Sequence, residues 1–165
     1  PSVDPSAGIV YSPEEHNLIA RDAATGQEYW QSTTDDEFWN SLYDEGSTFQ
    51  IPTIVSTPTV TEDFVYVNGA TPHQILAYER GVSAKTPRKP THIHQLESKP
   101  IAEPIATSTR LYVATERKFL CLDRNSFELN WSVDEDDVEG EFKTAPVPNG
   151  YRVYVGTSNG IIALE

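Results

Sequence analysis

The feature that most constrains the fold is an internal repeat of a tyrosine, an aspartate and a tryptophan at fixed intervals. In two places the Asp follows the Tyr by 11 residues and the Trp follows it by 19, in the sets Tyr11, Asp22, Trp30 and Tyr112, Asp123, Trp131. The Tyr recurs at Tyr154, and less regularly at Tyr66. Proline stands eight residues before three of these tyrosines, at Pro58, Pro104 and Pro146. This periodicity indicates a repeat protein with four units.

Each unit is predicted to be an antiparallel meander of about four strands, because alternating apolar runs are separated by turn residues. Thr25-Gly26 and Asn159-Gly160 are two such turns. Phe127 stands where the first unit has Gly26, which predicts a different turn in which Asn125 takes the left-handed conformation. The units are expected at residues 1–33, 52–96, 100–133 and 145–165, the last without its fourth strand.

A short helix is expected between the first two units, at residues 34–45. Its start, Thr34-Asp35-Asp36-Glu37, has the form of a capping box. Four apolar residues follow at helical spacing and form one face: Phe38, Trp39, Leu42 and Tyr43. Two interpretations stay open, since such a face either packs on the repeats or contacts a partner or ligand.

Composition excludes some classes of function. The 165 residues carry a net charge of -13, which argues against binding to nucleic acid or to an anionic membrane surface. The acidity fits either an ordinary solubilising surface or adaptation to high salt. A mean hydropathy of -0.46, with no apolar run of about 18 residues, excludes a transmembrane helix. The sequence begins Pro1-Ser2 without Met or a leader, so we expect a processed piece of a longer protein.

Few residues suggest catalysis or metal binding. Cys121 is the single cysteine and is expected to be a small core residue. His92 and His94 share a strand face, but no third ligand lies nearby in the sequence, so a solvated face is favoured over a metal site. The acidic run 134–141 has Val138 where a calcium loop needs a ligand, and it is interpreted as a solvated linker.

Two motifs resemble the quinoprotein-type, or PQQ-like, β-propeller repeat. They are Ala20-Arg21-Asp22-Ala23-Ala24-Thr25-Gly26 with Trp30, and Val153 to Leu164. The resemblance implies an all-β fold, a β-propeller of four-stranded antiparallel blades, here about four repeats in one domain or segment spanning 1–165. Three arrangements stay open: part of a larger propeller, a homodimer that completes a ring, or a small closed ring. The expected structural repeat positions are Asp22, Gly26, Trp30, Asp123, Trp131, Gly156, Asn159 and Gly160.

The same resemblance implies two classes of function. The family includes dehydrogenases that use PQQ, calcium, a catalytic Asp and, in the alcohol enzymes, a pair of cysteines. Cys121 has no Cys neighbour, and Asp22 and Asp123 repeat as turn residues do, so no catalytic or cofactor-binding residue is assigned. The family also includes non-catalytic propellers, such as outer-membrane assembly lipoproteins and sensor domains fused to kinases.

We therefore expect a non-enzymatic scaffold that binds a protein, peptide or small ligand through its loops or channel, outside the cytoplasm or at the cell surface. No cofactor is expected for this chain. The partner contact is expected at Phe38, Trp39, Leu42 and Tyr43. The alternative is a fragment of a PQQ- and calcium-dependent dehydrogenase whose catalytic residues lie outside this chain.

Overall fold

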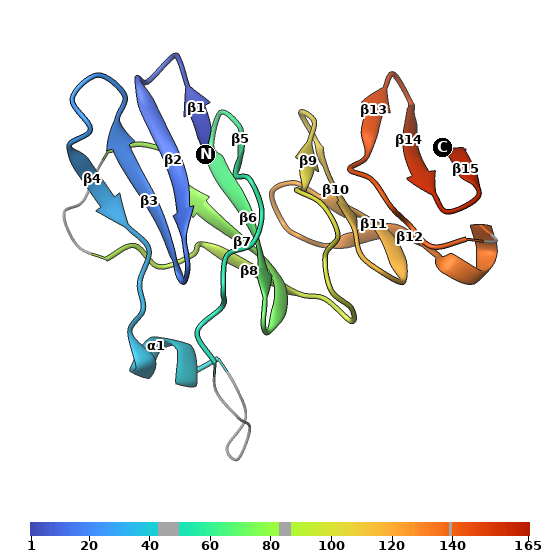
Figure 1. The fold of residues 1–165 in the computed structure, drawn as a ribbon, viewed down its shortest axis with the longest axis horizontal. Helices are drawn as coiled ribbons and strands as arrows, with labels where there is room; N and C mark the ends of the chain where they lie inside the picture. Colours follow the sequence, from blue (N-terminus) through green and yellow to red (C-terminus); the bar gives the residue numbers. More distant parts are fainter. Residues whose placement is uncertain (43–49, 83–86, 139) are drawn as a thin grey trace. The chain divides into compact units, whose positions relative to one another are not determined.

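The computed structural model describes residues 1–42, 50–82, 87–138 and 140–165. Within them the chain divides into two compact units, Pro1–Gln95 (unit 1) and Leu96–Glu165 (unit 2). Each unit contains two antiparallel sheets, coloured in sequence order in Figure 1. The four sheets coincide with the four repeats expected from the tyrosine spacing.

The first sheet of unit 1 has the order β1-β2-β3-β4. Its strands are Ser2–Asp4, Ile9–Glu14, Asn17–Asp22 and Glu28–Gln31. Tyr11 pairs with Ala20, and Ala20 pairs with Trp30, so these side chains share one face. All three are buried, which explains why the repeat retains an aromatic anchor at each end of this row.

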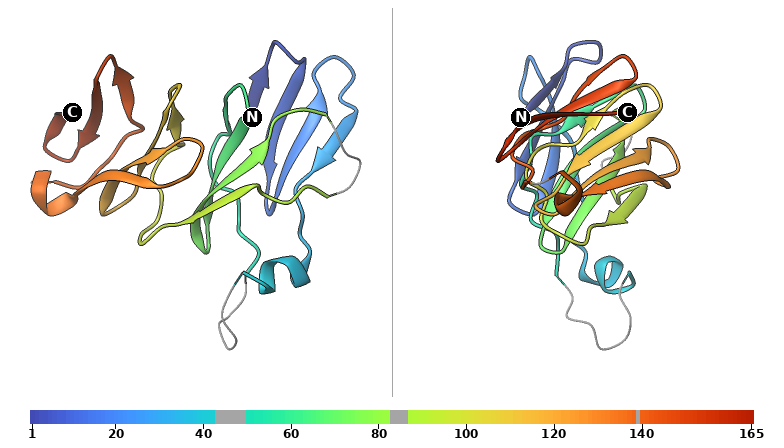
Figure 2. Two further views of the ribbon diagram at one scale, coloured as in Figure 1. Left: turned by 180° about the vertical axis from the view of Figure 1, so that it is seen from behind. Right: turned by 90° about the vertical axis from the view of Figure 1, so that its right-hand side faces the viewer.

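The second sheet of unit 1 has the order β5-β6-β7-β8, and consecutive strands lie side by side in Figure 2. Its strands are Thr59–Val60, Phe64–Ala70, His73–Glu79 and His92–Gln95. Trp30 of the first sheet stacks on Tyr78 of this one at 6.1 Å between ring centroids, and its Nε1–H donates to the carbonyl of Gly81 at 2.7 Å. Trp30 thus packs between the two sheets of unit 1.

Unit 2 repeats this arrangement with a shorter last sheet. The third sheet has the strands β9 Ile105–Ala106, β10 Arg110–Ala114, β11 Lys118–Asp123 and β12 Leu129–Asp134. A single 3₁₀ turn, η1, follows at Glu135–Val138. The fourth sheet has only β13 Val147–Asn149, β14 Arg152–Thr157 and β15 Gly160–Leu164. The two sheets pack around Phe119, Phe142, Val153 and Val155.

The turn after the third strand is the same in the first and third repeats, so the prediction of a different turn with Asn125 left-handed is wrong. Phe127 has φ +61°, close to the +73° of Gly26. In both turns the Asp side chain accepts from the backbone N–H groups two and three residues later, at 2.7–3.0 Å. Phe127 is only 7% exposed, so burial of its ring offsets the cost of the left-handed backbone.

The inserted helix, α1, is shorter than expected. It spans Asp36–Asn40, and its N-cap is Asp35, whose side chain accepts from the Glu37 N–H at 2.9 Å. The Thr34 hydroxyl is therefore not the cap that the capping-box pattern predicted. An Asp one residue later is an equally good N-cap, which is why the pattern misplaces the start.

Candidate functional site

In both units, two kinds of loop lie together at one end of the sheets. They are the turn between the second and third strands and the connection that leads to the next sheet. In unit 2, the Glu116 N–H donates to the Lys99 carbonyl at 2.9 Å, and the Glu135 N–H donates to the Arg117 carbonyl at 2.8 Å. Phe142 forms an isolated antiparallel bridge with Thr157, the last residue of β14. These backbone contacts fix the loops that carry the polar side chains.

A cleft of about 440 Å³ opens at this end of unit 2, and we call it the unit-2 cleft. Phe142, 1% exposed, lies at its base and packs against Phe119 at 6.0 Å between ring centroids. The cleft therefore combines an apolar base with a charged wall. Its lining residues are Ile101, Glu116, Arg117, Glu135, Glu141, Phe142 and Lys143.

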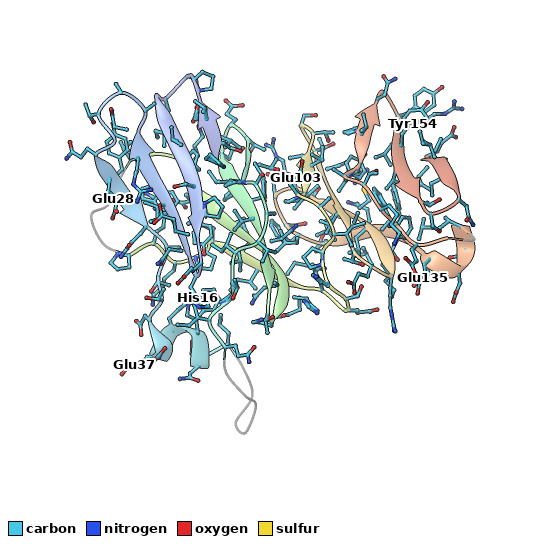
Figure 3. All side chains as sticks on the ribbon, in the orientation of Figure 1. His16, Glu28, Glu37, Glu103, Glu135 and Tyr154 are labelled. Atoms are coloured by element: carbon cyan, nitrogen blue, oxygen red, sulfur yellow. The ribbon has the colours of Figure 1, made fainter. Side chains whose placement is uncertain are left out.

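The charged side chains of this region differ in whether an ion pair neutralises them. Lys143 pairs with Glu141, and its hydrogen bond lowers the pKa of that carboxyl below its usual value. Among the described residues, Glu116, Glu135 and Arg117 have no side-chain ion pair. Figure 3 labels Glu135 at the start of η1. The wall of the unit-2 cleft thus presents two carboxylates and one guanidinium to solvent.

A neighbouring depression of about 290 Å³ extends the acidic surface. The amino group of Lys118 is held there by Glu97 at 2.6 Å and by Asp134 at 3.7 Å. The other charged side chains around it are Glu135, Asp136 and Arg117, so acidic groups outnumber basic ones. The potential around the unit-2 cleft is therefore negative, which favours a cationic ligand.

Unit 1 has a cleft at the equivalent place, the unit-1 cleft, of about 520 Å³. Its loops are held in the same way, since Ile54 N–H donates to the Glu15 carbonyl and Ala70 N–H to the Thr53 carbonyl, both at 2.8 Å. The described residues that line it include no carboxylate, and they are His16, Gln50, Ile51, Thr53 and Thr71. His16, labelled in Figure 3, lies in the turn between β2 and β3. The two clefts thus share a backbone and differ in chemistry.

The four residues expected to form a partner contact have different environments. Trp39 is 1% exposed, belongs to the core of unit 1, and donates its Nε1–H to the Thr33 carbonyl at 3.1 Å. Phe38 is half-buried against the same core, whereas Leu42 is 42% exposed. Tyr43 lies outside the described residues. The burial of Trp39 favours the interpretation that the helix packs on the repeats.

The histidines and the cysteine considered for metal binding or catalysis pack against other side chains of the fold. His92 packs its ring edge-on against Phe64 at 5.5 Å, and burial lowers the pKa of His94. Cys121 is 1% exposed, as expected of a small core residue, and burial raises its pKa. Across the described part of the chain, no group of three or more His, Cys, Asp and Glu side chains is placed to hold a metal ion.

The structural repeat positions divide by role. Asp22 and Asp123 hold their turns, and the hydrogen bonds from Tyr29 and from Thr25 lower the pKa of Asp22 to about 2. Trp30 is buried, whereas Trp131 is only partly buried and stacks on Phe119 of its own sheet at 5.7 Å between ring centroids. In the last hairpin, Gly160 has φ +135° after exposed Asn159, and Gly156 lies against the Thr144 side chain.

Sequence reasoning missed both clefts. Each is built from residues that do not repeat and that lie far apart along the chain. One signal was available, because His16, Thr71 and Arg117 all stand five residues after an anchor tyrosine. The acidic run after β12 was expected to be only a linker, yet Val138 packs against the core of unit 2 and Glu135 lines the unit-2 cleft.

No helix in the part of the chain that the structure describes is long and apolar enough to span a bilayer. No protein-family model and no curated protein sequence matches the chain. Among solved structures, BamB from Moraxella catarrhalis is similar with a TM-score of 0.69 at 13% identity, over 98% of this chain and 47% of that one.

Quinohemoprotein alcohol dehydrogenase from Comamonas testosteroni is similar with a TM-score of 0.63 at 14% identity, over 93% of this chain and 28% of that one. This chain thus spans less than half the length of either protein. Four successive antiparallel sheets, the recurring Tyr and Trp anchors and both similarities agree on one conclusion. The chain has the PQQ-type β-propeller fold.

Proposed function

We propose that this propeller scaffold binds an extended, positively charged segment of a partner protein in the unit-2 cleft. The observation that carries the proposal is the pair of carboxylates, Glu116 and Glu135, which face solvent beside the apolar base formed by Phe142. An extended segment that alternates cationic and apolar side chains would satisfy both features. The net charge of -13 would speed the encounter with such a partner.

The proposal includes a location outside the cytoplasm or at the cell surface, where an exposed binding scaffold of this fold would meet its partners. It also assigns binding to loops held by rigid sheets, the usual division of labour in such scaffolds. A second copy of the chain is one partner that the proposal allows. Light scattering on the chain alone would detect such a dimer.

The test uses two fluorescein-labelled decapeptides, one alternating Lys with Val and one alternating Glu with Val. Fluorescence anisotropy should show binding of the Lys peptide alone, weakening as salt is added. The double variant Glu116→Gln and Glu135→Gln should bind it about 5- to 30-fold more weakly, the loss expected for two exposed ion pairs.

The matched control is Glu28→Gln and Glu37→Gln, two exposed carboxylates of unit 1 that change the net charge by the same amount (Figure 3). This control should bind the Lys peptide nearly as well as the unchanged chain. Equal weakening in both double variants would show that only net charge matters, and the assignment of the unit-2 cleft would fail.

A dehydrogenase is the second candidate, favoured by the similarity to a quinohemoprotein alcohol dehydrogenase. A calcium ion takes about six to eight oxygen ligands, and the described residues offer no group of three or more candidate side chains. These residues therefore do not fit a calcium-PQQ centre, and we derive no reaction step for them. Dye-linked alcohol or sugar oxidation after addition of PQQ and calcium would support this candidate over the first.

A further inference from the structure

Three depressions of unit 2 adjoin one another, because they share part of their lining. The unit-2 cleft shares Arg117 and Glu135 with the depression of about 290 Å³. It shares Glu135, Glu141 and Lys143 with a third depression of about 510 Å³. The three therefore form one continuous surface, which we call the unit-2 groove, and an extended segment can follow it past more than one depression.

Charge is distributed unevenly along the unit-2 groove. The charged residues described in its lining are the carboxylates Glu97, Glu116, Asp134, Glu135, Asp136 and Glu141 and the cations Arg117, Lys118 and Lys143. Two of the cations are neutralised, since Lys118 is held by Glu97 and Asp134 and Lys143 is held by Glu141. Among the described residues of the groove, Arg117 is the one cation without a side-chain partner.

The turn that carries Arg117 is fixed by hydrogen bonds that do not involve its guanidinium. The Thr115 N–H donates to the Lys118 carbonyl at 2.8 Å, and the Lys118 N–H donates to Thr115 Oγ1 at 2.9 Å. The Arg117 carbonyl accepts from the Glu135 N–H at 2.8 Å. The side chains of Glu116 and Arg117 are exposed at the tip of this turn. The turn therefore presents one negative and one positive group side by side.

We propose that Arg117 determines the specificity of the unit-2 groove, by selecting a segment with one acidic side chain between cationic ones. This inference rests on the proposed function. Arg117 lines both the unit-2 cleft and the smaller acidic depression, so the acidic side chain of the segment lies between cations that face Glu116 and Asp134. A guanidinium binds a carboxylate through two parallel hydrogen bonds and repels a cation at the same point. A uniformly cationic segment is therefore the poorer ligand.

Three fluorescein-labelled decapeptides test the proposal. The Lys–Val peptide is the alternating one used to test the proposed function. The central-Glu peptide has Glu in place of its central Lys, and the terminal-Glu peptide has Glu in place of its first Lys. The last two peptides have the same composition and net charge, so they differ only in where the acidic residue lies.

Anisotropy titration should show that the central-Glu peptide binds about 2- to 5-fold more tightly than the Lys–Val peptide, the gain expected for one exposed ion pair. Attraction by the net charge of -13 alone predicts the opposite order, because the central-Glu peptide is less positive. The terminal-Glu peptide should bind no more tightly than the Lys–Val peptide.

Variants of the chain test the location. Arg117→Gln should remove the preference for the central-Glu peptide, and Arg117→Glu should reverse it. The control is Arg152→Gln, which removes the same charge from an exposed residue of β14 that is not among the described residues lining the groove. The preference should survive in this control. All three variants should fold, because the side chains replaced are exposed.

Three results would overturn the proposal and leave the proposed function in place. They are tighter binding of the Lys–Val peptide to the unchanged chain, a preference for the central-Glu peptide that survives in Arg117→Glu, and equal loss of preference in Arg117→Gln and Arg152→Gln. If none of the three peptides binds, the proposed function fails and this inference fails with it.

Discussion

Replacing Trp30 by Ala should destabilise unit 1 more than replacing Trp131 by Ala destabilises unit 2, although both residues hold the same place in the repeat. Trp30 is 2% exposed, stacks on Tyr78, and donates to the Gly81 carbonyl. A buried Trp removes about 200 Å² from water, worth about 5 kcal/mol. Ala retains a small part of this, so we expect a loss of about 4 kcal/mol.

Trp131 is partly buried and stacks on Phe119 of its own sheet, so about a quarter less area is lost. We expect a cost of about 3 kcal/mol for Trp131→Ala. The residues that cover Trp30 belong to the end of β7 and the segment after it, in the next repeat. Trp131 also packs against the core of unit 2, but among the described residues no aromatic ring of the following sheet stacks on it. The expected difference between the two variants is therefore about 1 kcal/mol.

Urea unfolding followed by circular dichroism measures both values, with the slope of each transition checked against the unchanged chain. Trp30→Phe is the companion variant, since it keeps a ring and loses the Nε1–H donor, and it should cost less than Trp30→Ala. Equal destabilisation by Trp30→Ala and Trp131→Ala would refute the reasoning, because it would mean that packing against the next repeat adds nothing.

Three further predictions concern turns and one ion pair. Phe127→Gly should lower the free energy of unfolding by about 2 kcal/mol in urea. Losing a buried ring costs about 3–5 kcal/mol, and relieving the left-handed backbone returns about 1–2 kcal/mol. A higher free energy of unfolding would contradict this prediction. The pKa of Asp22 is lowered to about 2 from 3.8, so its stabilising effect is present above about pH 4 and lost toward pH 2. Asp22→Asn should flatten that part of the pH–stability curve, and an unchanged curve would count against the turn. Arg80→Met should cost about 3 kcal/mol, since it leaves the carboxylate of Asp4, 3% exposed, without its ion-pair partner; Arg80→Lys should recover part of the loss.

The sheets could be predicted from the sequence because the residues that define them repeat. The interval from Tyr11 to Trp30 recurs from Tyr112 to Trp131, and it corresponds to three strands in the same register in both sheets. Even the register shift between the third and fourth strands falls at the same place, after Ala20 and after Cys121. A backbone that recurs needs the same side chains in the same places, and such a pattern is visible in one sequence.

Local rules failed where tertiary packing decided the conformation. The absence of Gly at Phe127 suggested a new turn, but Asp123 and the burial of the Phe ring preserve the old one. The capping box suggested a cap at Thr34, but Asp35 fills that role. In the turn, burial of the ring outweighs the local preference of Asn for the left-handed conformation, whereas at the helix the sequence offers two neighbouring residues with similar capping preference.

The candidate binding site lay beyond prediction for a different reason. Five residues after each anchor tyrosine the chain has His16, Thr71, Arg117 and Asn159, four residue types at one position of the repeat. The first three line the clefts of their units, where the backbone is repeated and the side chain is not. A position that packing constrains would show the same residue each time, as the anchors do. Repeat positions that share a backbone conformation and differ in residue type are therefore where binding specificity should be sought in this chain. Arg117 is charged and exposed beside Glu116 and Glu135, so it is the first of these positions to replace, by the His or Thr that the other repeats have there.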